Sequence, residues 1–418
     1  MMKEHVGIKM IFSFGAMVLF WTVVLLGGNS VPSFAAGPEF PENPIIGSEV
    51  FIGKGCMRCH TILGEGGTVG PDLGKTGLHS SFMDLAGIMW NHSPQMERKF
   101  QEQKIQRPRL SSEEMKNLLG FLYYLDYFDK PGNPLEGEKI FREKRCSTCH
   151  SLGGKGGMVG PPPSPPPLDR FKQYVSPIFF ATALWNAMKN MTQAMRTHHH
   201  QNMERPFFRE NDVTNILAYI KVAGIVKEEY TRVYITPGNP NTGRVLFVEK
   251  GCVQCHATGK SGESGKTSLR TQDLMGSLTQ IAGTIWKHGP KMWAKMAESD
   301  FPTPAFTEGE MSDIIAYIYF LQHVDQPGDP QRGKRLFQEQ EKGCHKCHPI
   351  QGIGGDKEIA PDLATEQNLN TPVDIIRAMW NHGSEMEEKM MEKGVTWPKM
   401  EKGEVNDLVE FIRSERAK

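Results

Sequence analysis

The chain has 418 residues, with 48 basic and 48 acidic side chains and a formal net charge of +0 at pH 7. This length is enough for several domains of ordinary size. The balance of charge argues against nucleic acid as a ligand, because such binding depends on neutralising phosphates with lysine and arginine.

The first 36 residues have the pattern of an export segment. Lys3 and Lys9 precede an uncharged, mostly apolar run over residues 10–26, and residues 33–35 offer a small-X-small cleavage site before Ala36. The run is slightly long for a signal peptide and just long enough to span a bilayer. We expect a cleaved signal peptide, and a retained membrane anchor formed by residues 10–26 is the alternative.

A unit of roughly a hundred residues then occurs four times. Each unit contains a Cys-X-X-Cys-His pentapeptide, and the first cysteines of successive copies are 90, 106 and 92 residues apart. A Pro-X-Asn/Asp-Pro stretch precedes each pentapeptide, and we expect an extended joint there because proline fixes φ and lacks an amide donor. The predicted domains cover residues 37–130, 131–236, 237–326 and 327–418.

The pentapeptide is the attachment sequence of haem c. Its two thiols can form thioethers with the haem vinyl groups, while the adjacent histidine binds the iron. A zinc site or a redox dithiol is the alternative reading of Cys-X-X-Cys. It is the weaker one, because a histidine follows every copy and all eight cysteines are used. The predicted haem-binding residues are Cys56, Cys59, His60, Cys146, Cys149, His150, Cys252, Cys255, His256, Cys344, Cys347 and His348.

The remainder of each unit predicts an all-α fold. Alternating strand patterns are scarce, and capping boxes at Ser111 and Thr307 precede amphipathic runs near the ends of units 1 and 3. Residues 160–167 (GPPPSPPP) predict a rigid polyproline stretch in unit 2.

With these motifs the chain resembles the class I cytochrome c family over nearly everything after residue 40. The resemblance rests on the pentapeptides, on the C-terminal helices, and on Gly-Pro-X-Leu at residues 70–73 with its counterpart at residues 361–363. It implies four tandem cytochrome c-like domains, each around one covalent haem. It also implies that the carbonyls of Pro71 and Pro361 steady the haem histidines through their second nitrogens. Unit 2 has its polyproline run at this place, and unit 3 has no proline there.

The chain departs from the family pattern at the sixth iron ligand. The resemblance implies a methionine immediately before a proline, ahead of the C-terminal helix. The residues found before those prolines cannot serve as ordinary haem ligands, so the irons are five-coordinate or the ligand lies elsewhere; they are Arg107, Arg205, Thr303 and Trp397.

A recurring stretch, MWNHSPQM at residues 89–96, offers a replacement. Related stretches begin at residues 184, 285 and 379, and methionine is the one potential iron ligand that all four share. The predicted sixth ligands are therefore Met96, Met191, Met292 and Met386. The alternatives are open sites, the histidines of three copies and other methionines, namely His92, His288, His382, Met195, Met296, Met390 and Met400.

The same stretch makes two structural predictions. A helix should end near Pro94 and near Pro290, with the predicted methionine ligand in the first turn of the next helix. If the helix continues instead, the histidine and the methionine of the stretch are four residues apart and share a face. The four tryptophans should pack against the haem edge or the core rather than take part in chemistry. They are Trp90, Trp185, Trp286 and Trp380.

Irons with both faces occupied favour electron exchange over substrate binding. We therefore expect a periplasmic electron carrier, not an enzyme, which relays electrons through four haems between a redox protein donor and an acceptor. One alternative is a haem peroxidase or small-molecule reductase with an open haem in unit 2, near Arg196 and His198. Another is the cytochrome subunit of a membrane respiratory complex.

Overall fold

The computed structural model describes residues 40, 44–62, 64–76, 80–157, 165–169, 177–197, 203–225, 238–259, 265–270 and 274–416. The predicted export segment and residues 160–164 of the polyproline stretch lie outside this set. Phe40–Lys418 forms one compact unit. Among the described helices, none is both long and apolar enough to cross a membrane.

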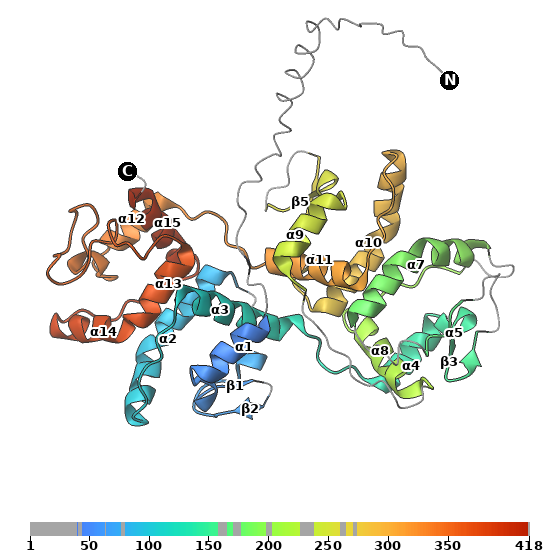
Figure 1. Cartoon of the computed structure of the whole chain (residues 1–418), viewed down its shortest axis with the longest axis horizontal. Helices are drawn as coiled ribbons and strands as arrows, with labels where there is room; N and C mark the ends of the chain where they lie inside the picture. The colour runs from blue at the N-terminus through green and yellow to red at the C-terminus, as the bar shows by residue number, and fades with distance from the viewer. Residues whose placement is uncertain are drawn as a thin grey trace, which may run out of the picture. The chain divides into compact units, whose positions relative to one another are not determined.

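The fold is all-α, as predicted, and the same order of elements recurs in each of the four sequence units, called repeats 1 to 4 below (Figure 1). Each repeat has an N-terminal helix, a short helical turn at the pentapeptide, a middle helix and a C-terminal helix. The N-terminal helices are α1 (Pro44–Gly53), α4 (Pro134–Glu143), α9 (Pro240–Glu249) and α12 (Pro330–Gln338). The pentapeptide turns are η1 (Cys56–Arg58), α5 (Cys146–Cys149), η3 (Cys252–Gln254) and η5 (Cys344–Lys346).

The middle helices are α2 (Phe82–Glu102), α7 (Pro177–Thr197), α10 (Leu278–Glu298) and, in repeat 4, the pair α13 (Pro372–Asn381) and α14 (Gly383–Glu392). The C-terminal helices are α3 (Ser112–Tyr127), α8 (Asp212–Ala223), α11 (Glu308–Leu321) and α15 (Glu404–Arg416). A further 3₁₀ turn, η2 (Leu73–Lys75), follows the proline loop of repeat 1. The predicted capping boxes are confirmed at Ser111 with Glu114 and at Thr307 with Glu310.

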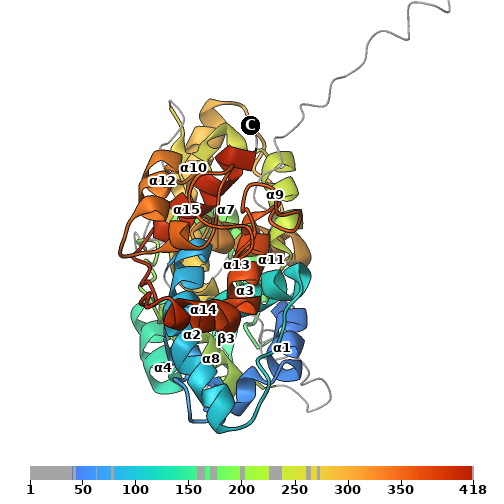
Figure 2. The same cartoon turned by 90° about the vertical axis from the view of Figure 1, so that its left-hand side faces the viewer.

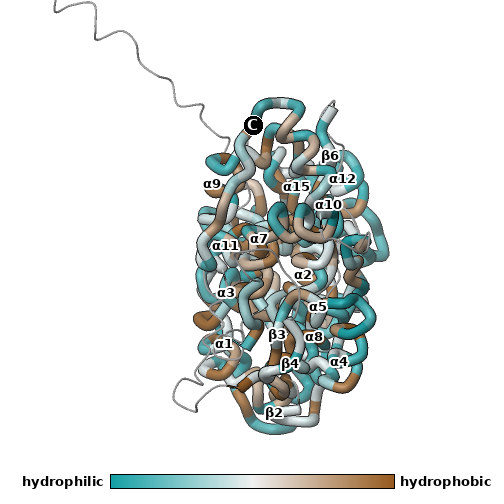
Figure 3. The backbone as a smooth tube through the Cα atoms, turned by 90° about the vertical axis from the view of Figure 1, so that its right-hand side faces the viewer, coloured by the Kyte–Doolittle hydropathy of each residue, from teal (hydrophilic) through white to brown (hydrophobic). Residues whose placement is uncertain are grey.

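Among the described residues, strands are confined to two-residue pairs at or just after the first three pentapeptides. They pair β1 (Thr61–Ile62) with β2 (Glu65–Gly66), β3 (Ser151–Leu152) with β4 (Lys155–Gly156), and β5 (His256–Ala257) with β6 (Thr267–Ser268). The first two pairs are antiparallel and the third is parallel. Hydrophobic and hydrophilic residues are interspersed along the tube of the chain (Figure 3).

The N-terminal and C-terminal helices of each repeat cross at a glycine. At each of these crossings, a Cβ added to the glycine would lie 1.9–2.1 Å from a carbonyl oxygen of the C-terminal helix. The four glycines are Gly47, Gly137, Gly243 and Gly333. An aromatic pair packs beside each crossing with ring centroids 5.5–5.7 Å apart: Phe51 with Phe121, Phe141 with Tyr219, Phe247 with Tyr317, and Phe337 with Phe411. Only glycine permits this approach of two backbones.

The joint before each of the last three repeats also stabilises this crossing of the N-terminal and C-terminal helices. Asn133 has an extended backbone, as expected, and its side chain caps α4, with Pro134 in the first turn. Its backbone N–H donates to Asn215 Oδ1 of the C-terminal helix at 2.8 Å. Asn239 and Asp329 make the equivalent caps and bonds in repeats 3 and 4. The joints therefore fix the start of the N-terminal helix as well as connecting the units.

The repeats do not pack in chain order. Helix α2 of repeat 1 packs against α13, α14 and α15 of repeat 4, and α7 of repeat 2 packs against α10 and α11 of repeat 3 (Figures 1 and 2). Repeats 1 and 3 also touch: Tyr319 donates from its hydroxyl to the Tyr123 carbonyl at 2.6 Å, and Tyr124 donates to the Gly238 carbonyl at 2.8 Å. The main contacts therefore arrange the repeats in the order 4, 1, 3, 2.

The predicted helix breaks at two prolines are wrong. Pro94 lies inside α2 and Pro290 inside α10, and both helices continue through them. A break does occur in repeat 4, where α13 ends and α14 begins around His382. A proline in a helix removes one hydrogen bond and normally kinks the helix. The contacts described below show what replaces that bond.

The crossing predicts opposite effects for two glycines of repeat 3. Gly243→Ala would place a Cβ 2.0 Å from the Asp313 carbonyl oxygen, so we expect the free energy of unfolding to fall by about 3 kcal/mol. Gly309→Ala in α11 meets no atom within 4 Å and should instead stabilise the chain by about 0.5–1 kcal/mol. Chemical denaturation followed by circular dichroism measures both, and equal effects would contradict the crossing.

Candidate haem sites and the pairing of repeats

The pentapeptide thiols are free and partly shielded from solvent. The eight cysteines are unpaired, and Cys255 alone among them is exposed. Burial raises the pKa of the first thiol of each pentapeptide to about 11, in Cys56, Cys146, Cys252 and Cys344. A reactive redox dithiol or a zinc site needs the thiolate, which low dielectric disfavours.

The donor set also differs from that of a zinc site. Within the described part of the chain, no group of three or more histidine, cysteine or acidic side chains is arranged to hold a metal ion. A structural zinc ion takes four such ligands. Two neutral thiols beside one histidine suit covalent attachment of a porphyrin better than binding of a bare metal ion.

Three of the four pentapeptide histidines are oriented through Nδ1. His60 Nδ1 lies 3.1 Å from the Pro71 carbonyl oxygen, and His348 Nδ1 lies 3.2 Å from that of Pro361. These are the contacts that the family resemblance implies. In repeat 2, His150 Nδ1 lies 2.9 Å from the carbonyl oxygen of Pro166, so the polyproline run supplies the acceptor there. With Nδ1 occupied, Nε2 is the nitrogen left for iron.

The backbone beside His60 is shaped to the imidazole. A Cβ added at Gly70 would lie 2.5 Å from His60 Cε1 and 2.6 Å from Nδ1. Any side chain here would displace the ring from the orientation that its hydrogen bond to Pro71 fixes. The residues of repeat 1 thus fit a covalently attached haem with His60 as its axial ligand.

Repeat 3 differs at this point. Thr267 occupies the place of the loop proline, and its backbone pairs with His256 in the β5–β6 ladder. The ring lies close to the Thr267 backbone, but its Nδ1 makes no well-formed hydrogen bond, and burial lowers the pKa of His256. A missing proline therefore leaves this imidazole less firmly oriented than the other three.

The predicted sixth ligands lie on or directly after the helices that carry the tryptophans. Met191, Met292 and Met386 pack against the core from α7, α10 and α14, and Met96 is partly buried on α2. Because α2 and α10 are continuous, His92 and Met96 share a face of one helix, as do His288 and Met292.

The alternative ligands have distinct surroundings. His92 Nδ1 bonds the Ile88 carbonyl oxygen at 2.7 Å, and His382 Nδ1 lies 3.1 Å from Glu385 Oε2. His288 contributes to the lowered pKa of His256, as His382 does for His348, so these histidines lie near the pentapeptide histidines of their own repeats. Met400 is buried against repeat 1.

The four tryptophans are partners in the pairing of repeats, which the sequence did not predict. Each indole Nε1 donates to the carbonyl of a loop proline in the paired repeat: Trp90 to Pro398, Trp185 to Pro304, Trp286 to Pro206 and Trp380 to Pro108, at 2.8–2.9 Å. All four indoles are half-buried or buried, as expected. The exchange is reciprocal within each pair, as at a two-fold interface between subunits.

The asparagine after the tryptophan completes the contact in three repeats. Asn186 Nδ2 donates to the Phe306 carbonyl at 2.8 Å, and its Oδ1 accepts from the Phe306 N–H at 3.1 Å. Asn91 does the same to Met400, and Asn381 to Leu110. Lys287 replaces asparagine in repeat 3, where its ammonium lies over the Phe207 ring of repeat 2.

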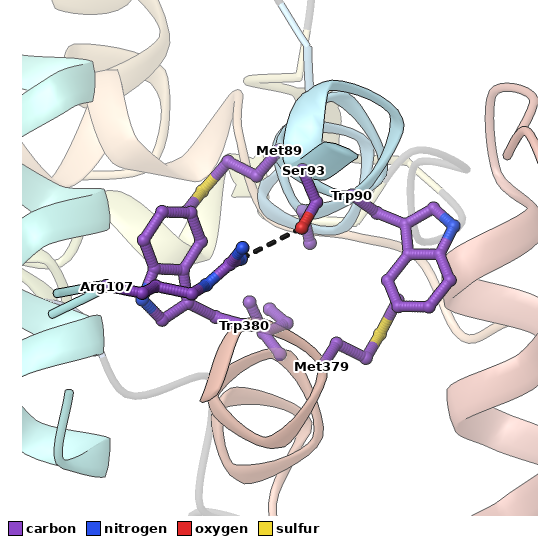
Figure 4. A pocket seen from close by; sticks show the side chains of 8 residues that line it. Met89, Trp90, Ser93, Arg107, Met379 and Trp380 are labelled. Carbon is purple, nitrogen blue, oxygen red and sulfur yellow. Dashed lines mark hydrogen bonds between the residues drawn. The ribbon is translucent and has the colours of Figure 1, made fainter. Parts of the chain in front are cut away.

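The residues before the loop prolines are part of the same interface. The Arg107 guanidinium lies 4.2 Å from the centre of the Trp380 ring and bonds Ser93 and Glu97 of its own repeat. A small cavity separates it from Trp90, and the Met89 and Met379 sulfur atoms point toward the tryptophans of the paired repeat (Figure 4). Such sulfur–aromatic contacts are favourable.

The pair formed by repeats 2 and 3 has the same contact, with Arg205 in the place of Arg107 and Trp286 in the place of Trp380. The Arg205 guanidinium lies 4.1 Å from the centre of the Trp286 ring, and burial lowers the pKa of Arg205 to about 10. At neutral pH this arginine is still charged, so a cation–π contact holds this pair as well.

The fold and the histidine sites define a multi-domain c-type cytochrome. The cytochrome c family model matches residues 45–126, 135–223 and 330–415, more than half of the sequence, and the chain belongs to the cytochrome c family. Family membership implies covalently bound haem c and haem-based electron transfer. Repeat 3 lies between the matched regions. Comparisons with curated proteins and with solved structures gave no match.

The pairing contact can be tested on one helix. Asn186→Ala removes two hydrogen bonds and leaves the Phe306 backbone unpaired, so we expect the free energy of unfolding to fall by about 2 kcal/mol. Asn190→Ala, one turn further along α7 at an exposed position, should change it by less than about 0.5 kcal/mol. Similar losses for both variants, measured by chemical denaturation, would contradict the assigned role.

Proposed function

We propose that this chain is an exported tetrahaem cytochrome c that relays electrons between redox protein partners. The observation that carries the proposal is the repeated imidazole geometry, in which His60, His150 and His348 each use Nδ1 for a proline-loop carbonyl. This leaves Nε2 of each ring available for iron, beside the two thiols of its own pentapeptide.

Haem c, once attached, supplies an iron that gains and loses single electrons. The chain's own residues then have three tasks. The thiols fix the porphyrin, the histidines supply one axial ligand, and the helix with the recurring stretch supplies the other, with Met96, Met191, Met292 and Met386 as the proposed ligands. A closed sixth position favours electron exchange and leaves no site for a substrate, which is why we propose a carrier rather than an enzyme.

The packing of the repeats supports a linear order for this relay. Repeat 4 contacts repeat 1, repeat 1 contacts repeat 3, and repeat 3 contacts repeat 2. Transfer between cofactors is fastest over short distances, so the proposed relay has its ends at repeats 2 and 4. Those ends are where a donor and an acceptor would dock.

Export is part of the proposal. Covalent haem attachment takes place outside the cytoplasm, and residues 1–36 have the charge pattern and apolar run of an export segment. We propose a periplasmic location, with the segment either removed as a signal peptide or kept as an anchor through residues 10–26. The kept anchor would place the relay beside a membrane respiratory complex.

The haem count tests the number of sites, and repeat 3 is the decisive one. The pyridine haemochrome spectrum of the purified full chain should give about four haems per polypeptide. Cys252→Ala combined with Cys255→Ala should lower the count by one, and the matched Cys146→Ala with Cys149→Ala variant should do the same. A wild-type count of three that the repeat 3 variant leaves unchanged would show that repeat 3 carries no haem.

The sixth ligand is best tested in repeat 2, where Ala187 replaces the competing histidine. Met191→Ala should let carbon monoxide bind about one haem in four in the dithionite-reduced protein, because the iron loses its sixth ligand. Met195→Ala, one turn further along α7, should leave carbon monoxide binding unchanged. If the Met195 variant alone opens a haem, the ligand assignment moves by one turn.

A further inference from the structure

Each helix proline leaves one backbone carbonyl of its own helix without a hydrogen-bond donor. A helical N–H bonds the carbonyl four residues earlier, and proline has no N–H. Pro94 therefore leaves the Trp90 carbonyl free within α2, and Pro290 leaves the Trp286 carbonyl free within α10. Both carbonyls belong to the tryptophans that pair the repeats.

The paired repeat supplies the missing donor in both cases. Trp397 of repeat 4 donates from Nε1 to the Trp90 carbonyl at 3.2 Å, and its ring stacks on Trp90 with centroids 4.1 Å apart. Arg205 of repeat 2 donates from Nη2 to the Trp286 carbonyl while lying over its ring. Two different side chains at the same position thus make the same bond.

The helices of repeats 2 and 4, which have no proline after the tryptophan, show that the proline matters. Lys189 takes the place of the helix proline in α7, which is continuous, so that helix needs no outside donor. In repeat 4, Ser384 takes this place just after the break around His382 between α13 and α14. Arg107, which faces Trp380 of repeat 4, bonds Ser93 and Glu97 of its own repeat instead of a carbonyl of repeat 4. The donor to the carbonyl and the helix proline occur together.

The hydrogen bond to the tryptophan carbonyl affects the sixth iron ligand because the helix proline lies close to that ligand in the sequence. Met96 is two residues after Pro94, and Met292 is two residues after Pro290. The alternative ligands, His92 and His288, lie between the tryptophan and the proline, so the argument holds for either choice. A helix that has lost a hydrogen bond at this point can hinge, and a hinge would move the ligand away from the iron.

We propose that Trp397 and Arg205 are positioning residues for the sixth iron ligands of the repeats they pair with. Trp397 of repeat 4 acts on the haem of repeat 1, and Arg205 of repeat 2 acts on the haem of repeat 3. The family pattern places a ligand to the repeat's own haem at this position before the proline. Here the same position holds the ligand helix of another repeat. The inference rests on the proposed haem sites.

The test uses the full-length, haem-loaded protein and carbon monoxide as the probe. Trp397→Phe keeps an aromatic ring but loses the N–H donor, so about one haem in four should become open to carbon monoxide in the reduced protein. The open haem should be that of repeat 1: combining the change with Cys56→Ala and Cys59→Ala, which removes this haem, should abolish the response.

A rescue variant and a control variant distinguish positioning of the iron ligand from stabilisation of the interface between repeats. Pro94→Ala added to Trp397→Phe restores an N–H for the Trp90 carbonyl within α2, so the double variant should again exclude carbon monoxide. Trp185→Phe, which loses the bond to Pro304 at a helix without proline, should weaken the pairing of repeats 2 and 3 and leave every haem closed.

Three results would overturn the inference. The first is opening of the repeat 4 haem in place of the repeat 1 haem in Trp397→Phe. The second is a double variant as open as the single one. The third is a lowered melting temperature with no haem opened, which would make the contact structural only. The haem count and carbon monoxide response of the wild-type protein, measured first, test the proposed function separately.

Discussion

The hydrogen bond from an indole N–H to the proline-loop carbonyl of another repeat is the interaction on which the arrangement of this chain depends. It occurs four times, between repeats 1 and 4 and between repeats 2 and 3, and each occurrence is answered by one in the opposite direction. A buried N–H and a buried carbonyl are costly to leave unpaired, so the contact fixes the mutual position of two helices as well as joining them.

This use of the loop explains the departure from the family at the sixth ligand. A loop that docks onto another repeat cannot also turn its side chain toward its own haem. Arg107, Arg205 and Trp397 instead lie against tryptophans of the paired repeats. The recurring stretch therefore makes two kinds of contact. Its tryptophan faces the paired repeat, while the proposed ligand, six residues later, lies on another side of the same helix in repeats 1 to 3 and on the following helix, α14, in repeat 4.

Within a repeat, a different constraint brings the haem-binding turn into place. Gly137 and its three counterparts allow the N-terminal helix to rest on carbonyl oxygens of the C-terminal helix, and the pentapeptide follows that helix directly. The joint asparagine or aspartate bonds both helices and sets their register. The crossing is thus built from local residues, whereas the pairing of repeats requires residues far apart in the chain.

The sequence by itself determined the all-α repeats, the capping boxes and the family, because helix patterns, caps and the pentapeptide spacing are local. It also predicted the histidine contacts of Pro71 and Pro361, through the family resemblance. The tertiary structure decided which repeats pair, that Pro166 serves His150, and that α2 and α10 continue through Pro94 and Pro290. Local rules predict a break at an internal proline, but Trp397 and Arg205 supply the missing hydrogen bonds from other repeats, and such a donor is visible only once the chain is folded.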